Sequence, residues 1–443
     1  MGTEPQETDA VTLRDRIAQG AISVVDVAAH FIARIEAADP DIGAFVWFDA
    51  DFVRHQAAAL DAQRRAGRAI GPLHGVPVAL KDVIDTARIP TENGTKADSG
   101  RVPDTDAELV TRLKSAGALI LGKTVTCELA FMTPSATRNP HDPDRTPGGS
   151  SSGSAAAVAA GMAPLTVGTQ TGGSVIRPAS FCGVTGFKPT FDAISTRGVL
   201  AQSPSLDTVG VFARTPREAA LLGDVLFASE RAGVPLPPPG LLRTVDAGAP
   251  LPPVLAVLRP PGWDKAAPET VAAMDELTAA LGEQAFAIDL PALFDKAADE
   301  RRRINLAEMA RCFHHYGARG GLGDAVRDAI AEGNTILARD YIAALDWPDL
   351  LNAMLDEVFA RCDAIICPAA PGPAPGRDTT GDPIFNGVWT LCGTPAVTVP
   401  VLDIDGLPLG VQLIGPRGGD ARLLRTAQWL YDWIDNAATG ETP

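Results

Sequence analysis

The chain is poor in the residues from which disulfide scaffolds and metal sites are built. It has six cysteines and six histidines in 443 residues, with no CxxC pair and no HExxH sequence. So few cysteines in so long a chain do not predict a disulfide scaffold. The histidine spacing gives no support for a metal site. We therefore expect no cofactor and no metal.

Positive charge and long apolar runs are also scarce. Lys and Arg number 38 against 54 Asp and Glu, which gives a formal net charge of −16. Such a surface repels the phosphates of nucleic acid and anionic membranes. The longest apolar stretch, residues 155–168, is shorter than the ~20 residues of a membrane-spanning helix. The N-terminal MGTEPQETDA is acidic and unlike a signal peptide. These features predict a cytoplasmic monomer or homodimer that contacts neither nucleic acid nor membrane.

Apolar residues make up 46% of the chain, and glycine and proline are abundant at 43 and 37. This composition predicts a large core with many tight turns rather than a disordered chain. Strand-like runs alternate with helical ones, which is typical of βαβ units. We expect strands near residues 76–80, 118–121, 165–167, 254–258, 364–367, 396–400 and 410–414. We expect helices after Ser23, over residues 51–66 and 105–116, across most of 267–355, and from Asp420 onward.

A sheet that begins near residue 75 and is completed after residue 360 predicts a single large α/β domain over residues 1–443. Its central mixed, twisted β-sheet is expected to be covered by helices on both faces. The expected divisions are an N-terminal helical arm (1–67), a core (68–230), a variable, mostly helical insertion (231–360) and a C-terminal part that completes the sheet (361–443).

The unusual segments are rich in glycine and serine, at residues 146–161 and 168–178. Glycine-rich loops let backbone N–H groups approach a ligand and stabilise an oxyanion. A phosphate loop is disfavoured because no Lys-Ser/Thr follows the glycines. A flexible linker is disfavoured because the apolar Ala155–Ala160 run follows directly. A nucleophile elbow around Ser151 fits GxSxG, but a loop precedes it and only His314 and His315 follow it.

A third interpretation takes the base from another part of the chain. Lys81 ends an apolar, strand-like run that starts at Gly75. Burial lowers the pKa of a lysine, so such a side chain can be neutral enough to accept a proton.

Together, these segments resemble the amidase signature family. The resemblance is carried by residues 71–82, 147–161, 168–189, 385–395 and 406–415. It covers about residues 8–215 and 360–433, with a weakly matched middle. It implies a hydrolase that acts on the C–N bond of a small-molecule linear amide, with anilides, esters or carbamates as further substrates.

The resemblance also implies a Ser–cis-Ser–Lys triad. Ser174 matches the nucleophile, Ser150 the bridging serine in a cis peptide after Gly149, and Lys81 the base. The backbone N–H groups of Thr171, Gly172, Gly173 and Ser174 match the oxyanion hole. A substrate pocket is expected from Met132, Thr133, Pro134 and Ser151, with the loops after Ser174 and the helical region Met309–His315.

One departure from the family pattern concerns a charge pair. Many members carry Asp four residues before the nucleophile and Arg two residues after it. Here those positions hold Gln170 and Ile176, and Arg177 stands one place further on. Because both charges are missing together, we expect a neutral arrangement in their place.

Two other functions remain open. The chain could be the amidase-like subunit of a tRNA-dependent glutamine amidotransferase, which works with partner subunits. It could also be a non-catalytic binding protein with the same fold, although the intact Lys81, Ser150 and Ser174 argue against that.

Overall fold

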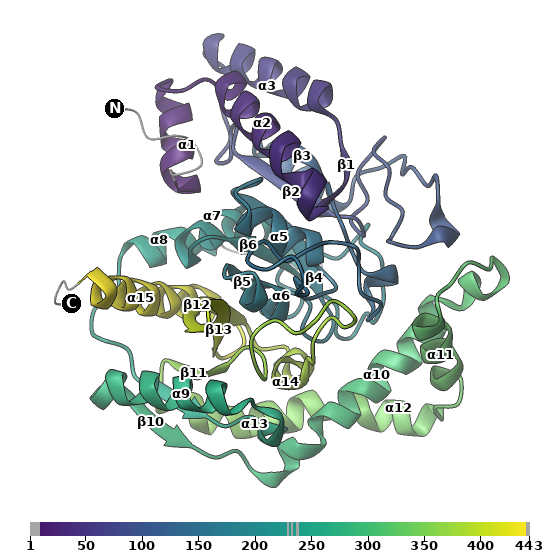
Figure 1. Cartoon of the computed structure of the whole chain (residues 1–443), viewed down its shortest axis with the longest axis vertical. Helices are drawn as coiled ribbons and strands as arrows, with labels where there is room; N and C mark the ends of the chain where they lie inside the picture. The colour runs from purple at the N-terminus through teal and green to yellow at the C-terminus, as the bar shows by residue number, and fades with distance from the viewer. Residues whose placement is uncertain (1–8, 228–229, 232–233, 236–238, 440–443) are drawn as a thin grey trace.

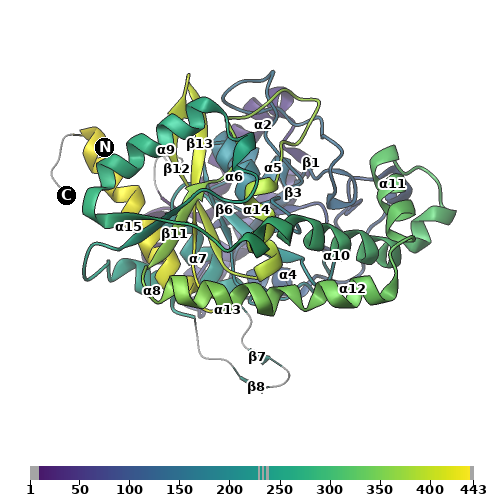
Figure 2. The same cartoon turned by 90° about the horizontal axis from the view of Figure 1, so that it is seen from below.

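The computed structural model describes residues 9–227, 230–231, 234–235 and 239–439. Its centre is a mixed sheet of eleven strands in the order β1-β3-β2-β4-β6-β5-β12-β13-β11-β9-β10 (Figures 1 and 2). The strands are β1 (Phe45–Phe48), β2 (Pro77–Lys81), β3 (Leu119–Thr124), β4 (Leu165–Gln170), β5 (Thr185–Lys188), β6 (Thr208–Ala213), β9 (Leu255–Leu258), β10 (Ala285–Ile288), β11 (Ala364–Pro368), β12 (Ala396–Ile404) and β13 (Leu407–Ile414). A separate small hairpin joins β7 (Glu230–Arg231) to β8 (Val234–Pro235).

The sheet has parallel strands toward each end and antiparallel strands between them. Strands β3, β2 and β4 are mutually parallel, as are β11, β9 and β10. The strands from β6 to β13 pair antiparallel and join the two parallel groups. The fold is therefore one α/β domain with a continuous mixed sheet, as the sequence predicts.

Helices cover both faces of the sheet. Along β2, Val78 and Leu80 belong to the hydrophobic core beneath α4, α7 and α15, whereas Ala79 packs into a second core beneath α2 and α3. This alternation is what a strand buried on both faces requires. The helices are α1 (Ala10–Gln19), α2 (Val24–Ile42), α3 (Ala50–Arg65), α4 (Glu108–Ser115), α5 (Ser152–Ala159), α6 (Ile176–Phe181), α7 (Pro216–Leu226), α8 (Leu241–Asp246), α9 (Pro268–Leu281), α10 (Ala297–Cys312), α11 (Asp324–Gly333), α12 (Ala338–Leu345), α13 (Trp347–Phe359), α14 (Ile384–Cys392) and α15 (Asp420–Thr439).

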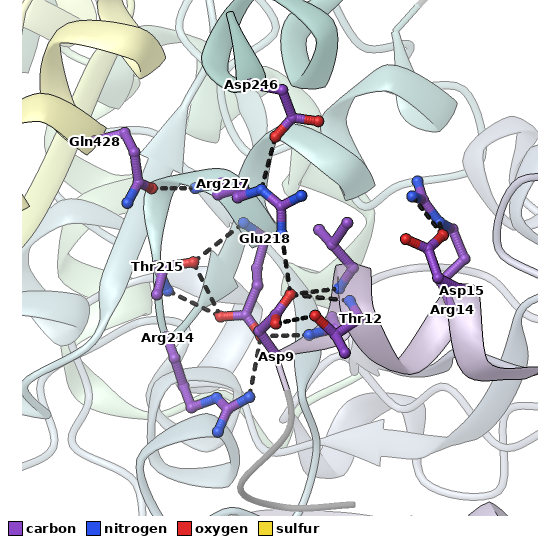
Figure 3. Close-up of polar contacts among 12 residues, drawn as sticks. Asp9, Thr12, Arg14, Asp15, Arg214, Thr215, Arg217, Glu218, Asp246 and Gln428 are labelled. Carbon is purple, nitrogen blue, oxygen red and sulfur yellow. Dashed lines mark hydrogen bonds and ion pairs between the residues drawn. The ribbon is translucent and has the colours of Figure 1, made fainter. Parts of the chain in front are cut away.

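Polar contacts tie the N-terminal helix α1 to α7 (Figure 3). Glu218 is fully buried, and its carboxylate accepts a hydrogen bond from the backbone N–H of Ala10 at 2.7 Å. The same side chain completes a capping box with Thr215 at the start of α7. Arg217 pairs with Asp9, the N-cap of α1, at 3.3 Å. One buried carboxylate thus satisfies the N-termini of two helices, which holds α1 against the sheet domain.

Most predicted elements are confirmed, including the helix capped by Ser23 and the last helix from Asp420. Two strands were not predicted. Strand β1 lies within the expected helical arm, and β10 lies within the expected helical insertion. The expected division of the chain at residues 67, 230 and 360 stays a prediction. Residues 1–8, on which most of the N-terminal expectation rests, lie outside the described residues.

The structure adds three findings about the residues that it describes. Among them no helix is long and apolar enough to cross a membrane. No group of three or more His, Cys, Asp or Glu within these ranges is placed to hold a metal ion. All six cysteines are free thiols.

Candidate active site

Lys81 lies at the carboxyl end of β2, where the parallel strands β3 and β4 also end. The carboxyl ends of parallel strands open at one edge of a sheet, which is where α/β proteins place ligands. The Lys81 side chain is fully buried. Its Nζ donates hydrogen bonds to Ser150 Oγ at 2.8 Å and to Thr169 Oγ1 at 2.9 Å. The structure therefore brings together two of the predicted residues that lie 69 positions apart.

Ser150 lies in the loop that leads into α5. The Gly149–Ser150 peptide bond is cis, as predicted. The next residue, Ser151, is also buried, and its Oγ donates to the Thr169 carbonyl at 3.2 Å and accepts from the Thr169 N–H at 3.3 Å. Within the described part of the chain, no histidine bonds to Ser151. The geometry therefore gives no support to a nucleophile elbow there.

Ser174 lies in the loop between β4 and α6 and lines a cavity of about 300 Å³. Thr171, Gly172 and Gly173 from the same loop line this cavity too. In the described ranges, the backbone N–H groups of Gly172, Gly173 and Ser174 make no hydrogen bond. A loop with three free N–H donors beside a hydroxyl is the arrangement that stabilises an oxyanion formed next to that hydroxyl.

The neutral arrangement predicted around Gln170 is present. Its Oε1 accepts hydrogen bonds from the N–H groups of Val175 and Ile176 at 2.9 and 3.0 Å. Its Nε2 donates to Thr390 Oγ1 at 3.0 Å. A fully buried amide thus fixes the end of β4 to the start of α6 without introducing a charge.

Arg177 connects the two serine loops from the opposite side. One of its Nη groups donates to the Gly149 carbonyl at 2.7 Å, and its Nε donates to the Thr380 carbonyl at 2.7 Å. Its other Nη group has no partner among the described residues. Burial lowers the pKa of Arg177 to about 10, so the side chain is charged at neutral pH.

Burial also dominates the electrostatics of Lys81. It lowers the pKa of Lys81 from 10.5 to about 7, and the nearby Cys127 and Asp207 oppose that shift. A lysine with this pKa is largely neutral just above pH 7, which is the state in which an amine accepts a proton.

Asp207 is the acidic residue at this site, and the sequence did not point to it. Its carboxylate accepts hydrogen bonds from Thr171 Oγ1 at 2.5 Å and from the N–H groups of Gln202 and Ser203 at 2.8 Å. Burial of the carboxyl group raises the pKa of Asp207 to about 7, against the lowering effect of these bonds. Asp207 therefore anchors the start of the Ser174 loop and lies within electrostatic reach of Lys81.

The predicted substrate-binding residues separate in the structure. Met132 lines the cavity that contains Ser174. Thr133 and Pro134 instead line a second cavity together with Ser135. Ser151 is buried in the hydrogen bonds described above.

The predicted pocket region Met309–His315 does not line the Ser174 cavity. Met309 is fully buried in a hydrophobic cluster, because it lies on the face of α10 that packs against α11. The preceding turns of the same helix line the cavity instead, through Arg301 and Asn305. Neither residue was predicted, and the signal available was a cluster of charge in a helical region, which is more often a solvated face.

Comparisons with known proteins agree with this geometry. Residues 26–424 match the sequence profile of the family described as Amidase. A glutamyl-tRNA(Gln) amidotransferase subunit of Symbiobacterium thermophilum is 36% identical, over 94% of this chain and 94% of its own. The native peptide amidase of Stenotrophomonas maltophilia has a TM-score of 0.82 at 29% identity, over 99% of this chain and 98% of its own. A 6-aminohexanoate cyclic dimer hydrolase has a TM-score of 0.85 at 26% identity, over 97% and 98%. An α/β domain with this serine site is that of an amidase, and the chain belongs to the amidase family.

The names of the relatives contradict the predicted partners. Each of these proteins is named as one subunit of an amidotransferase, and the name includes a tRNA. The prediction of a monomer or homodimer without nucleic acid is therefore wrong. That prediction used the net charge of one chain, and the charge of one subunit does not decide what an assembly binds.

Proposed function

We propose that the chain cleaves the C–N bond of a carboxylic amide through an acyl-enzyme on Ser174, with Ser150 and Lys81 relaying the proton. The observation that carries the proposal is the 2.8 Å contact between buried Lys81 Nζ and Ser150 Oγ beside the loop that bears Ser174. A base this deeply buried has its proton-accepting form favoured near neutral pH.

The reaction begins when neutral Lys81 accepts the hydroxyl proton of Ser150 as Ser150 accepts that of Ser174. Ser174 Oγ bonds to the amide carbon, and the resulting oxyanion is held by the N–H groups of residues 171–174. Ser150 then returns a proton to the leaving nitrogen, the C–N bond breaks, and the amine or ammonia departs. Water attacks the acyl ester, which releases the acid and restores Ser174.

The test of this mechanism is Ser174→Ala, with Ser195→Ala as the control. Ser195 is a serine outside the cavity, where it bonds to Glu108. We expect Ser174→Ala to lose amide turnover and labelling by a serine-reactive fluorophosphonate, while Ser195→Ala keeps both. Retained turnover in Ser174→Ala would show that another group is the nucleophile. Absence of both signals in the wild-type chain would favour a non-catalytic binding protein.

The curated relatives favour one setting for this chemistry, the amidase-like subunit of a tRNA-dependent amidotransferase. In that setting the ammonia released from an amide such as glutamine passes to an acyl-tRNA bound by partner subunits. The alternative setting is free hydrolysis of small amides, anilides, esters or carbamates.

Purification from the native cell distinguishes these settings. A heteromer that amidates glutamyl-tRNA with glutamine supports the amidotransferase setting. A chain that purifies without other proteins and turns over simple amides at full rate refutes it. A cytoplasmic location stays a prediction for either setting.

A further inference from the structure

An arginine without a counter-charge lines the Ser174 cavity. Three consecutive arginines lie in the first turns of α10, at positions 301–303. Arg302 pairs with Glu332, and Arg303 pairs with Glu300. Arg301 lines the cavity, and no described residue gives it a hydrogen bond or an ion pair. The three neighbours therefore differ in the one respect that matters for an anionic ligand.

The Arg301 guanidinium lies beside the loop that carries the predicted oxyanion hole. A Cβ placed on Gly172 would lie 3.4 Å from an Nη atom of Arg301, and one placed on Gly387 would lie 2.8 Å from its Nε. Gly172 is two residues from Ser174, and two residues of extended chain span at most about 7 Å. A group bound by Arg301 therefore lies a few bonds from an acyl carbon bound to Ser174.

A second donor lies on the same face of α10. Asn305 follows Arg301 by four residues, which places both side chains on one side of the helix. It lines the cavity with a 6% exposed side chain, and its Nδ2 has no hydrogen-bond partner among the described residues. A buried donor without a partner is costly unless a ligand completes it. Two unsatisfied donors, one of them cationic, match the two oxygens of a carboxylate.

The charge of Arg301 persists at neutral pH. Burial lowers the pKa of Arg301 to about 10, helped by Arg302 and opposed by Asp382. Asp382 forms its own ion pair with Lys265 at 2.8 Å. A cation removed from water without a counter-ion is unfavourable, and a planar guanidinium is suited to a bidentate carboxylate.

We propose that Arg301, supported by Asn305, binds a carboxylate on the acyl part of the substrate. This inference rests on the proposed amide cleavage and names its substrate class. The substrates are primary amides that carry a carboxylate a few bonds from the amide carbonyl. Monoamides of small dicarboxylic acids and the side-chain amides of amino acids belong to this class.

The kinetic experiment compares an acid monoamide with a diamide of nearly the same shape. Succinamate is paired with succinamide, and glutaramate with glutaramide. We expect kcat/KM for the better acid to exceed that of its diamide by about 10- to 100-fold, as a charge-assisted bidentate contact provides. Arg301→Gln should bring this ratio close to one, mainly through KM. Arg301→Lys should give an intermediate ratio because it keeps the charge and loses the planar fork.

Arg303→Gln is the matched control, because it removes a guanidinium two positions away that pairs with Glu300 outside the cavity lining. Its ratio of acid to diamide should equal that of the wild-type chain. An acid preference absent from the wild-type chain, or preserved in Arg301→Gln, overturns the assignment of Arg301.

Calorimetric binding keeps this assignment testable apart from turnover. Ser174→Ala should bind succinamate or glutaramate more tightly than the matching diamide, and adding Arg301→Gln should abolish the difference. A wild-type chain that cleaves both amides without an acid preference refutes the Arg301 proposal and leaves the amide cleavage intact. A chain that binds the acids through Arg301 but cleaves no amide refutes the proposed function alone.

Discussion

The pH dependence of amide cleavage follows from the burial of Lys81. Burial lowers the pKa of this side chain from 10.5 to about 7. At pH 7.5 about three quarters of such a lysine is neutral, against about one thousandth for a lysine of ordinary pKa. Burial therefore raises the fraction of active base by nearly 10³-fold, equivalent to about 4 kcal/mol. We expect kcat/KM to rise about tenfold per pH unit below pH 7 and to level off above it.

The assay is the initial rate of ammonia release from one primary amide between pH 5 and 10. Circular dichroism at each pH confirms that the chain stays folded. Lys81→Arg is the companion variant, because arginine keeps the positive charge and does not deprotonate in this range. We expect Lys81→Arg to lose at least about 10³-fold in kcat/KM at every pH.

Asp207 requires its own control, since burial places its pKa at about 7 as well. The carboxylate raises the pKa of Lys81. If Lys81 sets the profile, Asp207→Asn should keep the rise in kcat/KM and move its midpoint to lower pH. If Asp207 sets the profile, the rise should disappear in that variant. A rate that is flat from pH 5 to 8, or a midpoint near pH 10, would falsify the assignment of Lys81 as the base.

Three further predictions concern the packing around the site. Gly173→Ala should lower kcat/KM by about 10²-fold or more, because its Cβ would lie 2.4 Å from Asn386 Oδ1; Gly172→Ala, whose nearest contact is 3.4 Å, should cost clearly less, and equal losses contradict the steric account. Gln170→Glu should destabilise the fold by about 1–3 kcal/mol in urea unfolding, and because burial raises a carboxyl pKa the loss should be larger at pH 8 than at pH 5. Lys81→Met should abolish activity and raise the melting temperature; the depressed pKa penalises the folded state fully below pH 7 and less as pH rises toward 10.5, so the gain at pH 6 should exceed that at pH 9 by about 2 kcal/mol, and a gain independent of pH would contradict it.

The sheet could be predicted where its strands are buried on both faces. Strands β2, β3 and β4 have every residue buried, and their continuous apolar runs were visible in the sequence. Strands β1 and β10 are short and only partly buried, and they lie at the two edges of the sheet. A four-residue edge strand among helices carries neither a continuous apolar run nor a clear alternation, so its neighbours decide its structure.

The residues of the site differ in the same way. Lys81 was identifiable because an apolar strand leads into it, and burial alone explains its chemistry. Thr169 and Asp207 have no comparable local signal, since threonine is common in strands and aspartate is common in loops. The contact of Thr169 with Lys81 spans 88 positions. Only the folding of β2 against β4 gives that hydroxyl its position beside the amine.

The three arginines of α10 show the limit of local reasoning most directly. The pair of Arg303 with Glu300 follows from their spacing of three residues on a helix, and it is readable from sequence. The pair of Arg302 with Glu332 depends on how α11 packs against α10, thirty residues further on. Arg301 is distinguished only by what the fold leaves beside it, which is a cavity and the Ser174 loop instead of a carboxylate. Local sequence can predict the partner of a charge, but the absence of a partner depends on the whole fold. For this reason the substrate class is inferred from the structure, while the amide chemistry could be anticipated from the sequence.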